Sequence, residues 1–187
     1  MSDWEELKSQ CAVCNRCALS QHRKNVVFGI GQETADIMFI GEGPGQQEDE
    51  TGIPFVGPAG KLLDDMLSII DIDRTNCYIA NIVKCRPPQN RDPQEFEQEA
   101  CIGYLWQQIE LVRPKIIVCL GRIAACRLLR KDFRITREHG TWTDRGGIWM
   151  TAIYHPSALL RDLTKRPETF DDLLSIREKA RELGISL

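Results

Sequence analysis

The chain has 187 residues, of which 42% are hydrophobic and 27% are charged, and its formal net charge is −3. This length suits one well-buried core, so we expect residues 1–187 to form a single domain. The slightly negative charge excludes a broad basic surface, and any contact with nucleic acid must therefore be local.

The beginning of the chain is acidic and polar and does not resemble a signal peptide. No apolar run approaches the ~18 residues of a membrane span. We therefore expect a cytoplasmic protein in a reducing compartment, without a membrane partner. In such a compartment, eight cysteines indicate metal or redox chemistry rather than disulfides.

Four short apolar segments read as buried strands, at 36–41, 77–83, 115–121 and 148–154. Helical patterns occupy 59–70, 93–112, 122–129 and about 169–183. Alternation of strands and helices predicts an α/β fold with a largely parallel sheet.

Polar or glycine-rich segments follow three of the predicted strands. The sequence GEGPG occupies 41–45, Asn81 precedes KCRPP at 84–88, and His155 begins a His-Pro-Ser segment. Ligands of parallel α/β sheets bind outside the carboxyl ends of the strands. We therefore expect these segments to line one cleft.

The glycine-rich segment after the first strand fits neither nucleotide-binding fingerprint, so we expect no nucleotide cofactor. Its glycines allow the backbone to pass close to a flat ligand, and Glu42, Glu48 and Asp49 are available for chemistry. The alternative interpretation is an acidic surface turn.

The cysteines form two groups. Cys11, Cys14 and Cys17 are spaced C-x2-C-x2-C, and Cys85 and Cys101 lie in polar surroundings. Four thiolates suit either zinc or a cubane iron–sulfur cluster, and spacing leaves open which of the first three is surplus. Inert buried thiols are expected in apolar segments, at Cys77, Cys119 and Cys126.

Several of these motifs occur together and in order, at 41–45, 48–49, 54–57, 81–88 and 155–161. With them the chain resembles the family 4 uracil-DNA glycosylases over about residues 14–161. The resemblance implies an α/β fold, a three-layer α/β/α sandwich around a central four-stranded parallel sheet. It also implies a [4Fe-4S] cluster, to which the segment 11–17 contributes. The implied ligands are Cys14, Cys17, Cys85 and Cys101, and Cys11 lies outside the pattern.

The resemblance further implies base excision repair, in which the N-glycosidic bond of deoxyuridine in DNA is hydrolysed and uracil leaves an abasic site. The implied uracil-binding residues are Glu42, Gly43, Phe55, Asn81 and His155. Phe55 would stack on the base, and the Asn81 amide matches both uracil O4 and N3–H. The implied catalytic residues are Glu48, His155 and Glu42, with Asp49 as an alternative acid for activating water.

A base inside a duplex must be flipped out to reach such a cleft, whereas a single strand needs no flipping. Expected DNA contacts are Ser157, Leu160, Arg161 and Arg86. Further cations for phosphates are Lys84, Arg91, Lys165 and Arg166. We expect a monomer acting on uracil-containing DNA.

The loop 84–92 contains no histidine, unlike that of related enzymes that bond covalently to the abasic sugar, so we expect simple hydrolysis. Two other interpretations are a non-catalytic iron–sulfur DNA-binding module of a repair or replication assembly, and a small nucleotide hydrolase with structural zinc. The first need not keep Glu48, Asn81 and His155 together, and the missing phosphate fingerprint disfavours the second.

Overall fold

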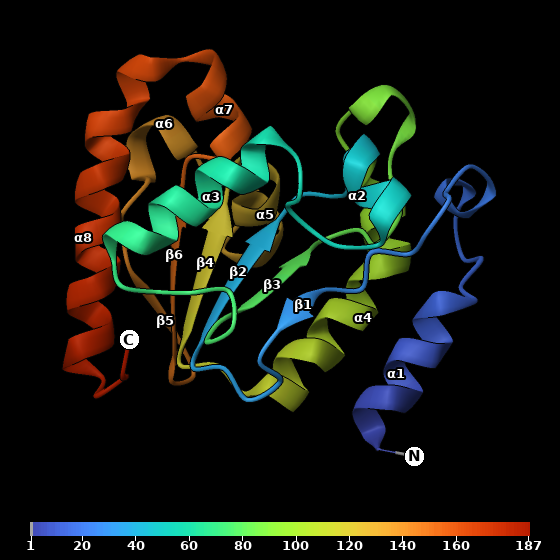
Figure 1. Cartoon of the computed structure of the whole chain (residues 1–187), viewed down its shortest axis with the longest axis horizontal. Helices are drawn as coiled ribbons and strands as arrows, with labels where there is room; N and C mark the ends of the chain where they lie inside the picture. Colours follow the sequence, from blue (N-terminus) through green and yellow to red (C-terminus); the bar gives the residue numbers. More distant parts are fainter. Residues whose placement is uncertain (1) are drawn as a thin grey trace.

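The protein is described by a computed structural model that covers residues 2–187. A six-stranded sheet forms its centre, in the order β1-β3-β2-β4-β6-β5 (Figure 1). The inner strands β3, β2, β4 and β6 are parallel, and β1 and β5 add antiparallel edges. The strands are β1 (Ile30–Gly31), β2 (Ile37–Gly41), β3 (Tyr78–Asn81), β4 (Ile116–Leu120), β5 (Thr143–Arg145) and β6 (Ile148–Ile153).

The four predicted strands are confirmed as the four inner parallel strands. Every residue of β2, β3 and β4 is buried, because helices cover both faces of the sheet. The edge strands were not predicted. β1 has only two residues and β5 is fully exposed, so neither carries an apolar pattern.

The four predicted helices are confirmed as α3 (Pro58–Ile69), α4 (Glu95–Val112), α5 (Arg122–Leu128) and α8 (Arg166–Glu182). The further α-helices of the described residues are α1 (Asp3–Ala12), α2 (Gln46–Thr51), α6 (Ile135–Glu138) and α7 (Pro156–Arg161). Ser2 caps α1, since its side chain accepts a hydrogen bond from the Glu5 backbone N–H. None of the described helices is long and apolar enough to cross a membrane.

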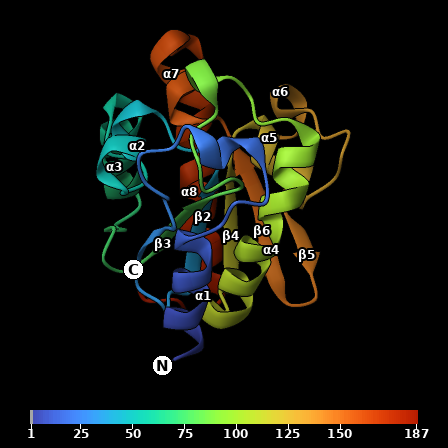
Figure 2. The same ribbon diagram turned by 90° about the vertical axis from the view of Figure 1, so that its right-hand side faces the viewer.

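One apolar core lies on each face of the sheet. Helices on both sides of the sheet make the molecule a three-layer sandwich (Figure 2). Helices α1, α4 and α5 pack on one face, with Leu7 and Leu105 among their buried residues. Helices α3, α7 and α8 pack on the other, through residues such as Leu63 and Ile176. The three-layer α/β/α fold implied by the resemblance is therefore confirmed.

The parallel register places the ends of β2 and β3 side by side, because Gly41 pairs with Asn81. A Cβ atom at Gly41 would lie 2.5 Å from Asn81 Oδ1 and 2.6 Å from the Phe55 ring. Only glycine permits this close approach. The strand ends thus bring the first two predicted segments of the cleft together.

Candidate active site

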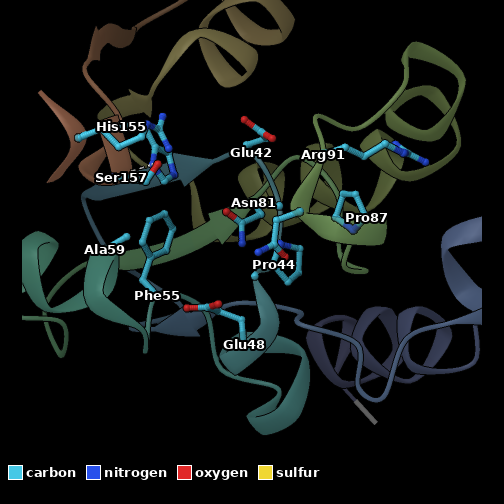
Figure 3. Close-up of a pocket in the computed structure, with 14 residues that line it drawn as sticks. Glu42, Pro44, Glu48, Phe55, Ala59, Asn81, Pro87, Arg91, His155 and Ser157 are labelled. Atoms are coloured by element: carbon cyan, nitrogen blue, oxygen red, sulfur yellow. Dashed lines mark hydrogen bonds between the residues drawn. The ribbon is translucent and has the colours of Figure 1, made fainter. Parts of the chain in front are cut away.

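A cavity of about 300 Å³ opens at the carboxyl edge of the sheet, among the loops that follow β2, β3 and β6. A cavity of this size suits a small ligand such as a nucleobase. All five predicted uracil-binding residues and the predicted acid Glu48 line it: Glu42, Gly43, Glu48, Phe55, Asn81 and His155. Figure 3 shows the labelled side chains of this group around the central Asn81.

The Asn81 side chain is buried at the end of β3, with 2% of its surface exposed. Its Oδ1 atom has no hydrogen-bond partner among residues 2–187. An unpaired buried acceptor is costly, and most such atoms in proteins have a partner. The Oδ1 atom is enclosed beside Gly41, while Asn81 as a residue lines the cavity.

His155 caps helix α7, where its Nδ1 atom accepts a hydrogen bond from the Ser157 backbone N–H at 3.1 Å. The Ser157 Oγ atom also lies 2.7 Å from Nδ1. Burial, and secondarily the Arg161 guanidinium, lower the pKa of His155 to about 4. The imidazole is therefore neutral at physiological pH, and its proton resides on Nε2 as a donor.

Phe55 lies beside His155, with ring centroids 5.6 Å apart and ring planes inclined by 31°. Its side chain belongs to the core beneath α3 and also lines the cavity. Its backbone adopts a left-handed conformation with φ of 54°, which is rare for a bulky residue. The surrounding structure must hold this conformation in place.

The two adjacent acids of α2 have different surroundings. Glu48 faces the cavity, and its Oε1 atom accepts hydrogen bonds from the backbone N–H groups of Val56 and Gly57 at 3.0 and 3.1 Å. Asp49 is buried and accepts from the Lys24 backbone N–H at 2.9 Å. Asp49 is not among the lining residues, so Glu48 is the acid of this pair that can meet a ligand.

Glu42 follows β2 and is half-buried at the cavity wall. Burial raises its pKa to about 7, Asp92 adds to the rise, and Arg122 and Arg161 oppose it. A carboxyl group with this pKa exists in both protonation states near neutral pH, as a group that transfers protons requires.

The predicted DNA contacts differ in whether they line the cavity. Ser157 and Arg161 line the cavity, and Leu160 is 42% exposed on the same helix. Arg86 does not line it, and its Nε atom donates to Asn90 Oδ1 at 2.8 Å.

The prediction that Lys84 contacts phosphate is wrong, because Lys84 is only 1% exposed. Its Nζ atom donates to the Asn81 carbonyl at 3.0 Å and to Gln108 Oε1 at 2.6 Å. The segment that carries it continues directly from β3 into the core, so the lysine stem turns inward.

Sequence reasoning placed Pro44 and Pro87 in segments expected to line the cleft, but it did not assign Ala59 or Asn90 to the cavity, which they also line. The turn chemistry of Pro87-Pro88-Gln89-Asn90 contained a signal for the last of these. Asn90 has φ of 54°, a conformation that asparagine adopts more readily than most residues. Arg91 also lines the cavity, while its guanidinium forms a bidentate ion pair with the buried Glu97.

Five cysteines converge on one small cavity between α1, α4 and the segment after β3: Cys11, Cys14, Cys17, Cys85 and Cys101. The Lys84 backbone N–H donates to Cys101 Sγ at 3.3 Å, and Arg23 Nη1 donates to Cys85 Sγ at 3.5 Å. Hydrogen bonds of this kind stabilise the negative charge of metal-bound thiolates.

Within residues 2–187, no set of three or more His, Cys, Asp or Glu side chains is arranged to hold a single metal ion. The donors in this cavity are all thiols, and Arg23 and Lys84 lie beside them; four thiolates suit a zinc ion or an iron–sulfur cluster.

The remaining cysteines agree in part with the expectation of inert buried thiols. Cys77 and Cys119 are fully buried in the sheet region, and burial raises the thiol pKa of Cys77 to about 12. Cys126 is only half-buried, because it faces the loop at Phe133, whose carbonyl lies 3.5 Å from its Sγ.

A family model described as the uracil DNA glycosylase superfamily matches residues 28–176. The chain belongs to this superfamily. It is 43% identical over 186 residues to a type-4 uracil-DNA glycosylase of Archaeoglobus fulgidus, covering 95% of this chain and 94% of that protein. A Thermotoga maritima protein of the same name is 46% identical over 151 residues, covering 80% and 79%.

A third relative is a much longer protein. The DNA polymerase of Bacillus phage SP01 is 31% identical over 144 residues, which are 76% of this chain and 16% of the polymerase. The type-4 relatives confirm the resemblance that the sequence motifs indicated. The region matched by the family model includes every residue that lines the cavity.

Proposed function

We propose that this protein is a type-4 uracil-DNA glycosylase, which hydrolyses the N-glycosidic bond of deoxyuridine in DNA and leaves an abasic site. Relatives that carry this name match 95% and 80% of the chain. The structural observation that carries the proposal is the Asn81 amide, which lines the cavity and whose Oδ1 atom has no hydrogen-bond partner among residues 2–187. Uracil offers a matching donor, N3–H, next to the acceptor O4.

In the proposed complex, the Asn81 amide turns so that Oδ1 leaves its enclosed position beside Gly41 and accepts from uracil N3–H, while Nδ2 donates to O4. Cytosine has an acceptor at N3 and a donor at C4, so it would face the same amide with mismatched groups. Phe55 contacts the face of the base. The neutral His155 donates from Nε2 to O2, where negative charge develops as uracil departs.

The acids act on the sugar side of the same bond. As the bond lengthens, the sugar gains positive charge, which the Glu48 carboxylate stabilises. The free oxygen of Glu48 orients the attacking water, because Oε1 is held by two backbone N–H groups. Glu42, with its pKa near neutrality, is suited to receive a proton from this water.

The flipped nucleotide enters from the rim of the cavity, where Ser157 and Arg161 contact the flanking phosphates. Leu160, exposed on α7, fills the space that the base vacates in the duplex. Arg86 contacts a phosphate on the side of the cysteine segment. The proposed enzyme is a monomer with one domain.

We assign the cysteine cavity to a [4Fe-4S] cluster held by Cys14, Cys17, Cys85 and Cys101. When bound, the cluster cross-links the N-terminal segment, the loop after β3 and helix α4, and so stabilises the fold. The Lys84 side chain joins this region to the site, since its Nζ atom donates to the carbonyl of Asn81. The cluster takes no part in bond cleavage.

The test of the activity is direct. Purified protein is incubated with an oligonucleotide that carries one deoxyuridine, and abasic sites are then converted to breaks with hot alkali. We expect breaks at the uracil and none in the matched oligonucleotides with thymine or cytosine. Binding of the uracil strand without alkali-sensitive sites would instead support a non-catalytic DNA-binding module.

A further inference from the structure

Arg74 lies in the loop between α3 and β3, outside the cavity lining, yet its guanidinium contacts the segment that forms one wall. Its Nη1 atom donates to the Pro54 carbonyl at 3.1 Å. Its Nη2 atom donates to the carbonyls of Phe55 and, at 3.2 Å, Gly60. The three bonds span seven residues of chain, and only the planar fork of arginine has enough donors in this arrangement.

The middle carbonyl belongs to a residue in an unfavourable conformation. Phe55 has φ of 54°, and such conformations persist only when neighbouring groups fix them. Gly60 confines Phe55 from another side, because a Cβ atom there would lie 1.9 Å from the Phe55 carbonyl oxygen. Arg74 binds the two carbonyls together at this point of closest approach.

The conformation of Phe55 matters because its ring lines the cavity next to the His155 ring. A rotation of the backbone toward ordinary φ values would move the ring relative to Asn81 and His155. We propose that Arg74 is a positioning residue for base binding, which acts by holding Phe55 in its left-handed conformation. This inference rests on the uracil-excising function proposed above.

A simpler role for Arg74 would be its ion pair with Asp64 on α3. The Asp64 side chain is 49% exposed, and exposed ion pairs contribute little to stability. The carbonyl bonds, in contrast, are partly buried. Asp64→Asn removes the ion pair and leaves the carbonyl bonds, so it separates the two roles.

The experiment is a double-mutant cycle on kcat/KM with a single-stranded uracil oligonucleotide, using Arg74→Ala, Phe55→Ala and the double variant. A positioning role predicts that Arg74→Ala lowers kcat/KM roughly 10- to 100-fold in the parent. In the Phe55→Ala background the same change should cost less than about 3-fold, because the ring it positions is gone. Arg74→Lys should recover only part of the loss.

Two variants serve as controls. Asp64→Asn should keep parental kcat/KM, and so should Arg145→Ala, which removes another arginine-to-carbonyl bond, to Leu129, far from the cavity. Thermal unfolding of each variant reports its stability separately. Where Arg74→Ala is insoluble, Arg74→Lys in the two backgrounds gives the same comparison.

Equal losses from the Arg74 change in both backgrounds, or parental activity in Arg74→Ala, would overturn the inference. If the parent excises uracil and either result is found, only the role of Arg74 is refuted, and the proposed function stands. A parent that does not excise uracil would refute the proposed function and this inference with it.

Discussion

The Ser157 backbone N–H donates to Nδ1 of His155 at 3.1 Å, and this bond determines which imidazole nitrogen carries the proton. With Nδ1 occupied as an acceptor, Nε2–H is the group that can face a ligand. The two residues are separated by one proline that begins helix α7, so the order His-Pro-Ser itself builds the contact. A short local motif thus sets the protonation of a site residue.

The neutral state of His155 has a consequence for the pH dependence of catalysis. Because its pKa is about 4, the excision rate should show no step near pH 6.5 that depends on His155. His155→Ala should lower the single-turnover rate about 10²- to 10³-fold. Ser157→Ala keeps the backbone donor and should cost only about 2- to 10-fold. A rate that falls with a midpoint near 6.5, and loses this step in His155→Ala, would contradict a neutral donor.

Glu42 makes stability depend on pH. Its pKa rises from 4.5 in the unfolded chain to about 7 in the folded protein, so the folded state holds the proton more tightly. The stabilising contribution of the protonated group is full below pH 4.5 and is lost as the pH rises toward 7. We expect Glu42→Gln to be more stable than the parent at pH 8, by about 2 kcal/mol, and equal to it near pH 4.

Urea unfolding at several pH values measures this difference. Glu33→Gln, at an exposed glutamate, is the matched control and should follow the parent throughout. A Glu42→Gln advantage that stays constant from pH 4 to pH 8 would show that the buried carboxyl is not the cause.

The cysteine assignment predicts coloured protein with about four irons per chain when prepared without oxygen. Cys85→Ser and Cys101→Ser should lose the iron and much of the soluble protein. Cys11→Ser should keep the iron but unfold at lower temperature, because Cys11 is buried in the core. Cys119→Ser is the matched control, because it changes a buried thiol of β4 that does not line the cysteine cavity. One zinc per chain, or equal loss of iron in Cys11→Ser, would contradict the assignment.

The products should be free uracil and an intact strand with an abasic site. The loop 84–92 contains no histidine that could bond to the sugar, and the one lysine within it, Lys84, is buried. A denaturing gel after boiling should therefore show neither a protein–DNA adduct nor breaks before alkali. Either band would mean that a protein group attacks the sugar in place of water.

Much of the fold was predictable because the inner strands are continuous apolar runs, as strands buried on both faces must be. The site was predictable where one residue at a strand end carries the chemistry, as at Asn81 and His155. Contacts between residues that lie far apart in the sequence were not predictable. Nothing in the sequence around Arg74 shows that it reaches carbonyls 14 to 20 residues away. Lys84 looked like a surface cation because its segment is basic, but its path after β3 is buried.

The most direct test of the account is the single-turnover release of uracil from a single-stranded oligonucleotide by the parent and by Asn81→Ala. Loss of the amide leaves the uracil edge without partners, at a cost of about 2–4 kcal/mol in the barrier, or roughly 30- to 1000-fold in rate. Unfolding midpoints of the two proteins confirm that both are folded. The account predicts this loss in a folded variant, whereas a folded Asn81→Ala that releases uracil at the parental rate would contradict it.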